Sequence, residues 1–130
     1  MNEIEKIENT ISYDIRGAIF QVYNELGPGL LESVYETALA YELRKLGYEI
    51  RTQVSLPFFY DKIEFDNGFR IDLLVENKVI IELKSVKQLD DLFYKQLLTY
   101  LRLSGLKLGI LVNFNSTDIS KSIKRVVNNL

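Results

Sequence analysis

The sequence contains neither cysteine nor histidine, and these two absences exclude several classes of enzyme. Without cysteine there is no disulfide framework, no thiolate zinc site and no cysteine nucleophile. Without histidine there is no Ser-His-Asp triad, no imidazole-bound zinc and no histidine general base. Any catalysis must therefore use carboxylates, Lys, Tyr, Ser or Thr.

The chain also lacks a long apolar run and a strong net charge. No segment approaches the ~18 apolar residues of a membrane span, and the charged N-terminus is unlike a signal peptide. We therefore expect no membrane contact and a cytoplasmic location. The length of 130 residues, 47% of them hydrophobic, suits one domain over residues 1–130. A net charge of −2 argues against coating nucleic acid by charge alone.

Hydrophobic periodicity predicts the order of secondary structure elements. Helical spacing of apolar residues predicts helices over residues 3–26, about 31–46 and 89–103. In the second of these, Val34 and Leu46 are expected to face the core. Alternation predicts strands over 48–65 (interrupted at Pro57), 69–76, 79–86 and 107–114, with a turn at 66–68.

The C-terminal segment is expected to form a last helix. Ser116 is a suitable N-cap, and Ile119, Ile123 and Val126 follow at helical spacing. Residues 87–130 carry three acids and seven bases, which is typical of either a basic binding face or a solvated helix surface. The complete order ααβββαβα predicts an α/β sandwich with a central mixed β-sheet flanked by helices.

Three charged residues interrupt otherwise apolar strand sequence. They are Asp72 in the segment Arg70-Ile-Asp-Leu-Leu-Val, and Glu82 and Lys84 in Val79-Ile-Ile-Glu-Leu-Lys. Burying unpaired charge is costly, and a strand core does not need it. Oxygen ligands for a hard divalent cation, with an ammonium group beside them, explain these charges and outline a metal-dependent phosphodiesterase site.

This site depends on the turn between the two strands. Side chains alternate between the faces of a strand, so Glu82 and Lys84 share a face. A two-residue turn at Asn77-Lys78 places Asp72 on the other face, whereas a three-residue turn over 76–78, or a β-bulge, places it opposite Glu82. The ordinary alternative is an ion pair between Asp72 and Lys84, with Glu82 facing solvent.

Two helices carry further candidate residues. Glu32 lies in the first turn of the second helix, where the macrodipole favours a carboxylate that can also reach a cation beyond the helix end. Gln96 and Tyr100 lie four residues apart on the third helix and therefore share a face. A helix-stabilising glutamate, and a polar pair that satisfies buried groups of the sheet, are the structural alternatives.

Together these motifs resemble those of a known superfamily. Asp72 followed by Glu82-x-Lys84 resembles the motif of the PD-(D/E)XK nucleases, and Gln96-x-x-x-Tyr100 looks like the motif that follows it in the RecB-like branch. The segment Gly29-x-x-Glu32-x-x-Tyr35 is similar to the namesake element of the GxxExxY family within that superfamily. The resemblance covers roughly residues 10–115 and departs from the superfamily name at Ile71, which stands where that name has Pro.

The resemblance implies a restriction-endonuclease-like three-layer sandwich and a nuclease that hydrolyses the phosphodiester bonds of DNA or RNA. It implies Mg²⁺ or Mn²⁺ as the cofactor. The implied roles are metal ligation by Asp72, Glu82, Glu32 and the Leu83 carbonyl, catalysis by Lys84, and support of the site by Gln96, Tyr100 and Tyr35.

Two other functions fit the same sequence. A nuclease fold can serve as a non-catalytic nucleic-acid-binding or protein-interaction domain, because a chain of this length and charge has little room for a substrate-recognition module. Exposed aromatic residues at Phe58, Phe59 and Tyr60 are also suited to a homodimer interface.

Overall fold

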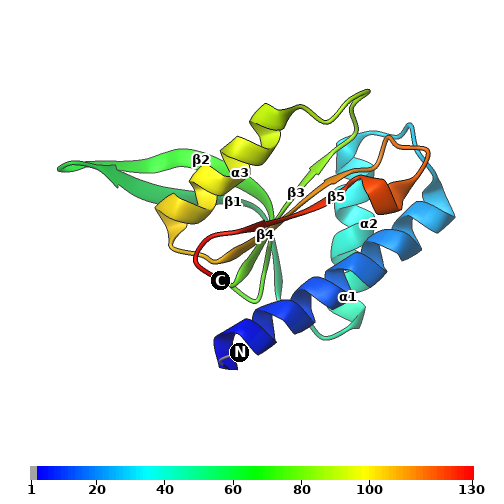
Figure 1. Ribbon diagram of the computed structural model, residues 1–130, viewed down its shortest axis with the longest axis horizontal. Helices are drawn as coiled ribbons and strands as arrows, with labels where there is room; N and C mark the ends of the chain where they lie inside the picture. The colour runs from blue at the N-terminus through cyan, green and yellow to red at the C-terminus, as the bar shows by residue number, and fades with distance from the viewer. Residues whose placement is uncertain (1–2) are drawn as a thin grey trace.

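The computed structural model describes residues 3–130 and consists of three long helices around one β-sheet (Figure 1). The helices are α1 (Glu3–Leu26), α2 (Glu32–Lys45) and α3 (Asp91–Ser104), with a short 3₁₀ helix η1 (Ile119–Lys121). The strands are β1 (Ile50–Tyr60), β2 (Ile63–Val75), β3 (Val79–Lys84), β4 (Leu108–Asn113) and β5 (Ile123–Val127).

The sheet is mixed, as expected from the order of elements. Its five strands lie in the order β1-β2-β3-β4-β5. Only β3 and β4 are parallel neighbours, and α3 makes the connection between them; the other pairs are antiparallel. The predicted α/β class and the mixed sheet are confirmed.

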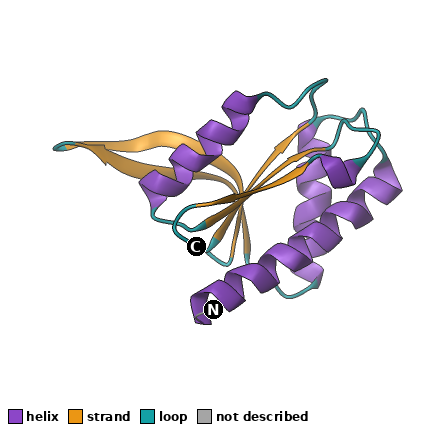
Figure 2. Ribbon diagram, in the orientation of Figure 1, coloured by secondary structure: helices purple, strands orange, loops and turns teal. Residues whose placement is uncertain are grey.

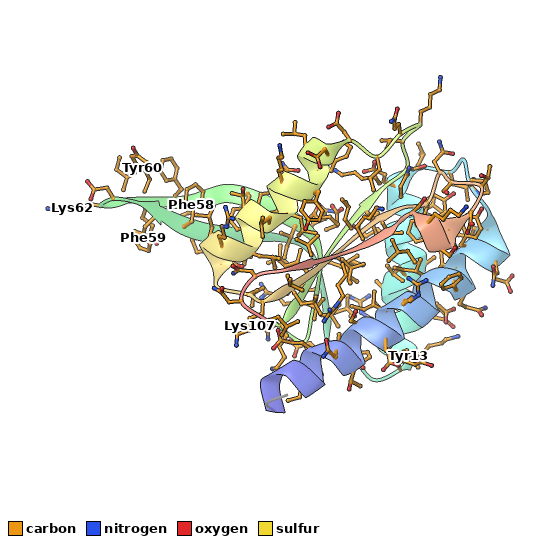
Figure 3. All side chains as sticks on the ribbon, viewed as in Figure 1. Tyr13, Phe58, Phe59, Tyr60, Lys62 and Lys107 are labelled. Carbon is orange, nitrogen blue, oxygen red and sulfur yellow. The ribbon has the colours of Figure 1, made fainter. Side chains whose placement is uncertain are left out.

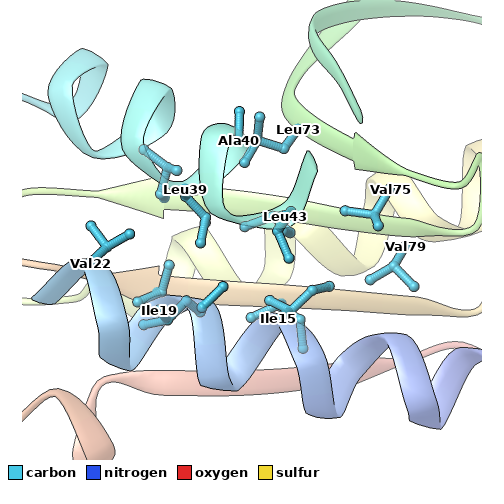
Figure 4. Close-up of a cluster of buried hydrophobic side chains, with 14 of the residues drawn as sticks. Ile15, Ile19, Val22, Leu39, Ala40, Leu43, Leu73, Val75 and Val79 are labelled. Atoms are coloured by element: carbon cyan, nitrogen blue, oxygen red, sulfur yellow. The ribbon is translucent and has the colours of Figure 1, made fainter. Parts of the chain in front are cut away.

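Helices cover both faces of the sheet, which gives three layers (Figures 1 and 2). On one face, α1 and α2 pack against apolar side chains of the sheet, and Figure 4 shows part of this core: Ile15, Ile19, Val22, Leu39, Ala40, Leu43, Leu73, Val75 and Val79. On the other face, Leu97 and Leu101 of α3 pack against a second apolar cluster that includes Ile80 and Leu111. The site residues are therefore held by a sheet whose two faces are both packed.

Two side chains of the second helix are exposed, although they were expected to face the core. Its buried residues are Tyr35, Leu39, Ala40 and Leu43. Val34 is 41% exposed and Leu46 is 58% exposed, so the prediction that both face the core is wrong. Val34 lies on the side of the helix away from this buried line, and Leu46 is the C-cap residue at which the helix ends.

The first hairpin turns at a different place from the one predicted. Tyr60 pairs with Ile63, so the chain reverses at Asp61-Lys62, where Asp61 has a φ of 53°. Aspartate tolerates this left-handed conformation better than most residues. The segment 66–68 is instead an irregularity within β2: Leu56 pairs with Phe69 and Phe58 with Phe65, so three residues face Pro57.

The hairpin of β1 and β2 extends beyond the rest of the molecule (Figures 1 and 3). Phe59 and Tyr60 are exposed near its tip. Phe58 is half-buried and stacks between Phe65 and Phe69, with ring centroids 5.0 and 6.0 Å away. The expected exposure is therefore found for Phe59 and Tyr60, whereas Phe58 packs within the hairpin.

The predicted last helix is wrong. Residues 119–121 form one 3₁₀ turn, and Ile123–Val127 form strand β5, antiparallel to β4. β-Branched residues favour strands, and the edge of β4 offers main-chain partners that an isolated helix lacks. The order of elements is consequently ααβββαβ followed by the 3₁₀ turn and a strand, and no basic helix face exists within residues 115–130, because Lys124 and Arg125 are consecutive residues of a strand.

Candidate active site

The turn between β2 and β3 has the three-residue form that the site requires. Val75 pairs with Val79, and Glu76, Asn77 and Lys78 connect them. Glu76 and Asn77 both adopt left-handed backbone, with φ of 53° and 54°. Continued by one residue beyond the pair Leu73–Ile81, this register places Asp72 across from Glu82, in agreement with the hydrogen bond between them, so the geometric condition drawn from the sequence is confirmed.

Asp72 and Glu82 are joined by two hydrogen bonds between neighbouring strands. The main-chain N–H of Leu83 donates to Oδ2 of Asp72 at 2.9 Å. The main-chain N–H of Asp72 donates to Oε1 of Glu82 at 3.2 Å. Each carboxylate is thus held by the backbone of the other's strand, which fixes both side chains without any contribution from a flexible loop.

Glu82 is a buried carboxylate with a strongly shifted pKa. The residue belongs to strand β3 and is only 7% exposed. Burial, followed by the negative charge of Asp72, raises the pKa of Glu82 to about 8, against the weaker opposing effects of the Asp72 N–H and the Lys84 charge. Removal from water disfavours the charged form, so a nearby cation would stabilise this group as a carboxylate.

Lys84 lies beside the acids and contacts an aromatic ring. Its Nζ is 4.5 Å from the centroid of the Phe93 ring, at the start of α3. The ion pairs found within residues 3–130 do not include Lys84. The alternative prediction of an ordinary ion pair between Asp72 and Lys84, with Glu82 in solvent, is therefore wrong on both points.

Glu32 is tied to the end of β3, next to Lys84. Its Oε2 accepts a hydrogen bond from the main-chain N–H of Ser85 at 3.2 Å. The Ser85 hydroxyl in turn donates to the carbonyl oxygen of Leu30 at 2.6 Å. These two contacts attach the start of α2 to the strand that carries Glu82 and Lys84.

Tyr35 is a buried residue that fixes the loop before α2. Its hydroxyl donates to the carbonyl oxygen of Gly27 at 2.6 Å and accepts from the N–H of Leu30 at 3.0 Å. Its ring stacks on Phe114, with centroids 4.4 Å apart. The contacts of Tyr35 are thus to the 27–30 loop and the core, and through that loop it supports the position of Glu32.

We expect Tyr35→Phe to lower the free energy of unfolding by about 1–2 kcal/mol, because the two loop contacts of the hydroxyl are lost. Urea denaturation of the variant and the wild type measures the change. Tyr41→Phe is the matched control, since Tyr41 is 61% exposed. A loss no larger than that of the control would contradict this role of the hydroxyl.

Tyr100 of α3 lies near the acids, with Gln96 one helical turn before it. Partial burial, followed by the negative charges of Glu82 and Asp72, raises the pKa of Tyr100, while a hydrogen bond with Gln96 opposes the rise. The Tyr100 ring stacks on Phe69 of β2 at a centroid distance of 4.3 Å. The phenol of Tyr100 therefore interacts with the Gln96 side chain and lies within electrostatic reach of both carboxylates.

Two residues at the site had no role assigned from the sequence. Glu36 lies one turn after Glu32, and burial raises its pKa, with smaller contributions from the charges of Asp72 and Glu32. Gln53 of β1 donates hydrogen bonds to both Glu36 and Asp72. The i, i+4 spacing of Glu32 and Glu36 was a usable signal for the first, whereas nothing local to Gln53 distinguishes it from a surface strand residue.

The chemistry of this donor set suits a hard divalent cation. Asp72 and Glu82 supply carboxylate oxygens on neighbouring strands, and Leu83 supplies a carbonyl oxygen between Glu82 and Lys84. Burial and the charge of Asp72 raise the pKa of Glu82 more than the charge of Lys84 lowers it, so a bound cation would supply further positive charge that this carboxylate needs. Among residues 3–130, however, no three acidic side chains lie close enough together to share one metal ion, so Glu32 is not part of a common cluster with the pair.

The domain is restriction-endonuclease-like. It has a mixed sheet between helices, two acids that face each other on adjacent strands, and a lysine two residues after the second acid. The sequence model of the PD-(D/E)XK nuclease superfamily matches residues 9–126, and the chain belongs to that superfamily. Comparison with curated proteins and with solved structures gave no match.

Within the part of the chain that is described, no helix has the length and apolar character needed to cross a membrane.

Proposed function

We propose that this protein is a metal-dependent nuclease of the GxxExxY family, in the RecB-like branch, which hydrolyses phosphodiester bonds of DNA. The observation that carries the proposal is the buried Glu82, 7% exposed and directly opposite Asp72. A carboxylate in this position is costly to the fold, and a hydrophobic residue would pack there without that cost. Its presence beside Asp72 and Lys84 is explained if these groups act together on a cation and a phosphate.

Asp72, Glu82 and the carbonyl of Leu83 are the groups that would hold Mg²⁺ or Mn²⁺. When bound, such an ion would polarise the scissile phosphate and lower the pKa of an attacking water. Glu32 is better suited to orient that water than to ligate the ion, because it contacts Ser85 and shares no cluster with the pair.

Lys84 is suited to stabilise negative charge on the phosphate in the transition state. This role requires only that the ammonium lie beside the phosphate, whereas removal of a proton from water would require a neutral amine. Phe93 holds the ammonium in place by a cation–π contact. Gln96 and Tyr100 border the site from α3 and restrict where the phosphate can lie.

The test is a cleavage assay with plasmid, linear duplex and single-stranded DNA, and with RNA, in Mg²⁺, Mn²⁺ or EDTA. We expect cleavage that requires a divalent ion and is lost in Asp72→Ala, Glu82→Ala and Lys84→Ala. Cleavage that is unchanged in all three variants would refute the assignment. Salt-dependent DNA binding without any cleavage, retained in all three, would instead identify a non-catalytic nucleic-acid-binding domain.

Two further elements of the proposal concern location and assembly. A cytoplasmic location agrees with a nucleic-acid substrate, and localisation of a tagged protein tests it. Homodimerisation through the tip of the first hairpin is supported by the exposure of Phe59 and Tyr60, which is 64% and 71%. Light scattering on the wild type and on Phe59→Ser would show a dimer and its loss; a monomeric wild type would contradict the homodimer.

A further inference from the structure

Gln53 has an unusual backbone conformation in the middle of a strand. Its φ is 50°, in the left-handed region that residues with a side chain rarely adopt. The strand changes character at this point, since Ile50 packs in the core under α1 and α2, whereas Val54 packs in the cluster under α3. Residues four apart in a regular strand share a face, so the faces of β1 reverse around Gln53, and those of β2 reverse at the same level, between Ile71 and Leu73.

Glycine would adopt this conformation without strain, yet the position holds a glutamine. The Gln53 side chain is exposed and contributes to neither hydrophobic cluster. Burial of apolar surface therefore does not account for it. Gln53 also lies within a strand and not at a turn, so the contacts of its exposed side chain are the place to look for a reason for the strain.

The side chain of Gln53 connects two carboxylates. Its amide nitrogen donates to Oε1 of Glu36 on α2 and, at 3.3 Å, to Oδ1 of Asp72 on β2. The amide has two hydrogens, one for each acceptor. Because the N–H of Leu83 donates to the other oxygen of Asp72, at 2.9 Å, both oxygens of this carboxylate have a donor, one from each neighbouring strand.

We propose that Gln53 is a positioning residue that sets the orientation of the Asp72 carboxylate and keeps Glu36 beside it. The proposal rests on the proposed function, because it matters only if Asp72 binds a cation. With the amide present, rotation of the Asp72 carboxylate is restricted from both sides, and two negative groups are held close together. Partners that orient metal ligands in this way typically change metal affinity by about 10–100-fold when they are removed.

Gln53→Gly separates this role from a structural one. The substitution removes the amide and also relieves the left-handed backbone. We expect Mn²⁺ affinity, measured by titration calorimetry, to fall by about tenfold or more, while the midpoint of thermal unfolding stays the same or rises. Gln53→Leu, which removes the amide but keeps the strain, should lose the same affinity without the gain in stability.

Asp61→Gly is the matched control. Asp61 has a φ of 53° and lies at the exposed turn of the hairpin, so the change relieves a similar strain without touching the site. We expect it to bind Mn²⁺ as the wild type does.

The possible failures are distinguishable. Wild-type affinity in both Gln53 variants would overturn the role of Gln53 and leave the proposed function standing. So would a loss of affinity in Gln53→Gly that is accompanied by a clear fall in its unfolding midpoint, because that identifies a structural residue. If the wild type itself binds no Mn²⁺, the proposed function fails first, and the role of Gln53 fails with it.

Discussion

Lys84→Met is expected to reduce phosphodiester cleavage by about a thousandfold, while the affinity for Mn²⁺ stays the same or increases. The ammonium of Lys84 stabilises charge that develops on the phosphate, and removal of one such group typically lowers the rate by about 10²–10³. Cation binding is not weakened, because the change removes a positive charge from beside Glu82 and Asp72. Single-turnover cleavage and titration calorimetry measure the two quantities separately.

Lys84→Arg distinguishes the two chemical roles of the lysine. A guanidinium remains protonated at all relevant pH values, so it can stabilise charge but cannot remove a proton from water. We expect Lys84→Arg to retain more activity than Lys84→Met. Lys87→Met, at an exposed lysine three residues along the chain, should cleave normally. Equal loss in the Met and Arg variants would favour the role of base, and normal cleavage by Lys84→Met would contradict any role.

The free energy of unfolding of the cation-free protein is expected to fall as the pH rises, and Glu82→Gln is expected to remove most of this fall. Burial and Asp72 raise the pKa of Glu82 from its ordinary value of 4.5 to about 8 in the folded protein. Between these two values the folded state binds more protons than the unfolded state. The free energy of unfolding of the wild type should therefore decrease as the pH rises from 4.5 to 8, with a slope on the order of 1 kcal/mol per pH unit from this group.

The comparison of wild type and variant isolates Glu82 from other titrating groups. Glutamine is a neutral isostere that still accepts a hydrogen bond from Asp72, so the two proteins should have similar stability near pH 5. At pH 8 the variant should be more stable. Mg²⁺ should stabilise the wild type at pH 8 and have little effect on the variant.

Urea denaturation between pH 5 and 8 measures these differences. Glu64→Gln, at an exposed acid of the hairpin, is the control and should change the pH profile little. A wild-type profile with the same slope as that of Glu82→Gln would show that Glu82 is ionised without a cation, contrary to its burial.

The parts of the fold that follow one dominant periodicity were predictable from sequence. The helix over residues 3–26 has a continuous apolar face, and it forms with those bounds. A condition on side-chain faces followed from the sequence, namely that Asp72 and Glu82 can meet if the turn is a three-residue turn over 76–78 or if a β-bulge intervenes, and the structure has the three-residue turn. The pairing of the two acids, the central feature of the site, was thus within reach of the sequence.

The remaining errors arise where tertiary contacts decide between two local patterns. Ile123, Val126 and Val127 fit helical spacing, but the free edge of β4 makes a strand the better solution for β-branched residues. The Asn67-Gly68 pair is a typical turn signal, yet the stacking of Phe58 between Phe65 and Phe69 continues the strands past it. Gln53 fits the pattern of the GxxExxY family, but its role could not be assigned from the sequence, because its contacts join residues that lie 17 and 19 positions away.

The most direct test of the account is to locate a bound Mn²⁺ by anomalous diffraction from crystals soaked in that ion. We predict a peak between the carboxylates of Asp72 and Glu82, within reach of the Leu83 carbonyl, and its disappearance in Asp72→Asn. Full occupancy of Mn²⁺ elsewhere on the protein, or no peak between these two carboxylates at concentrations that support cleavage, would contradict the account.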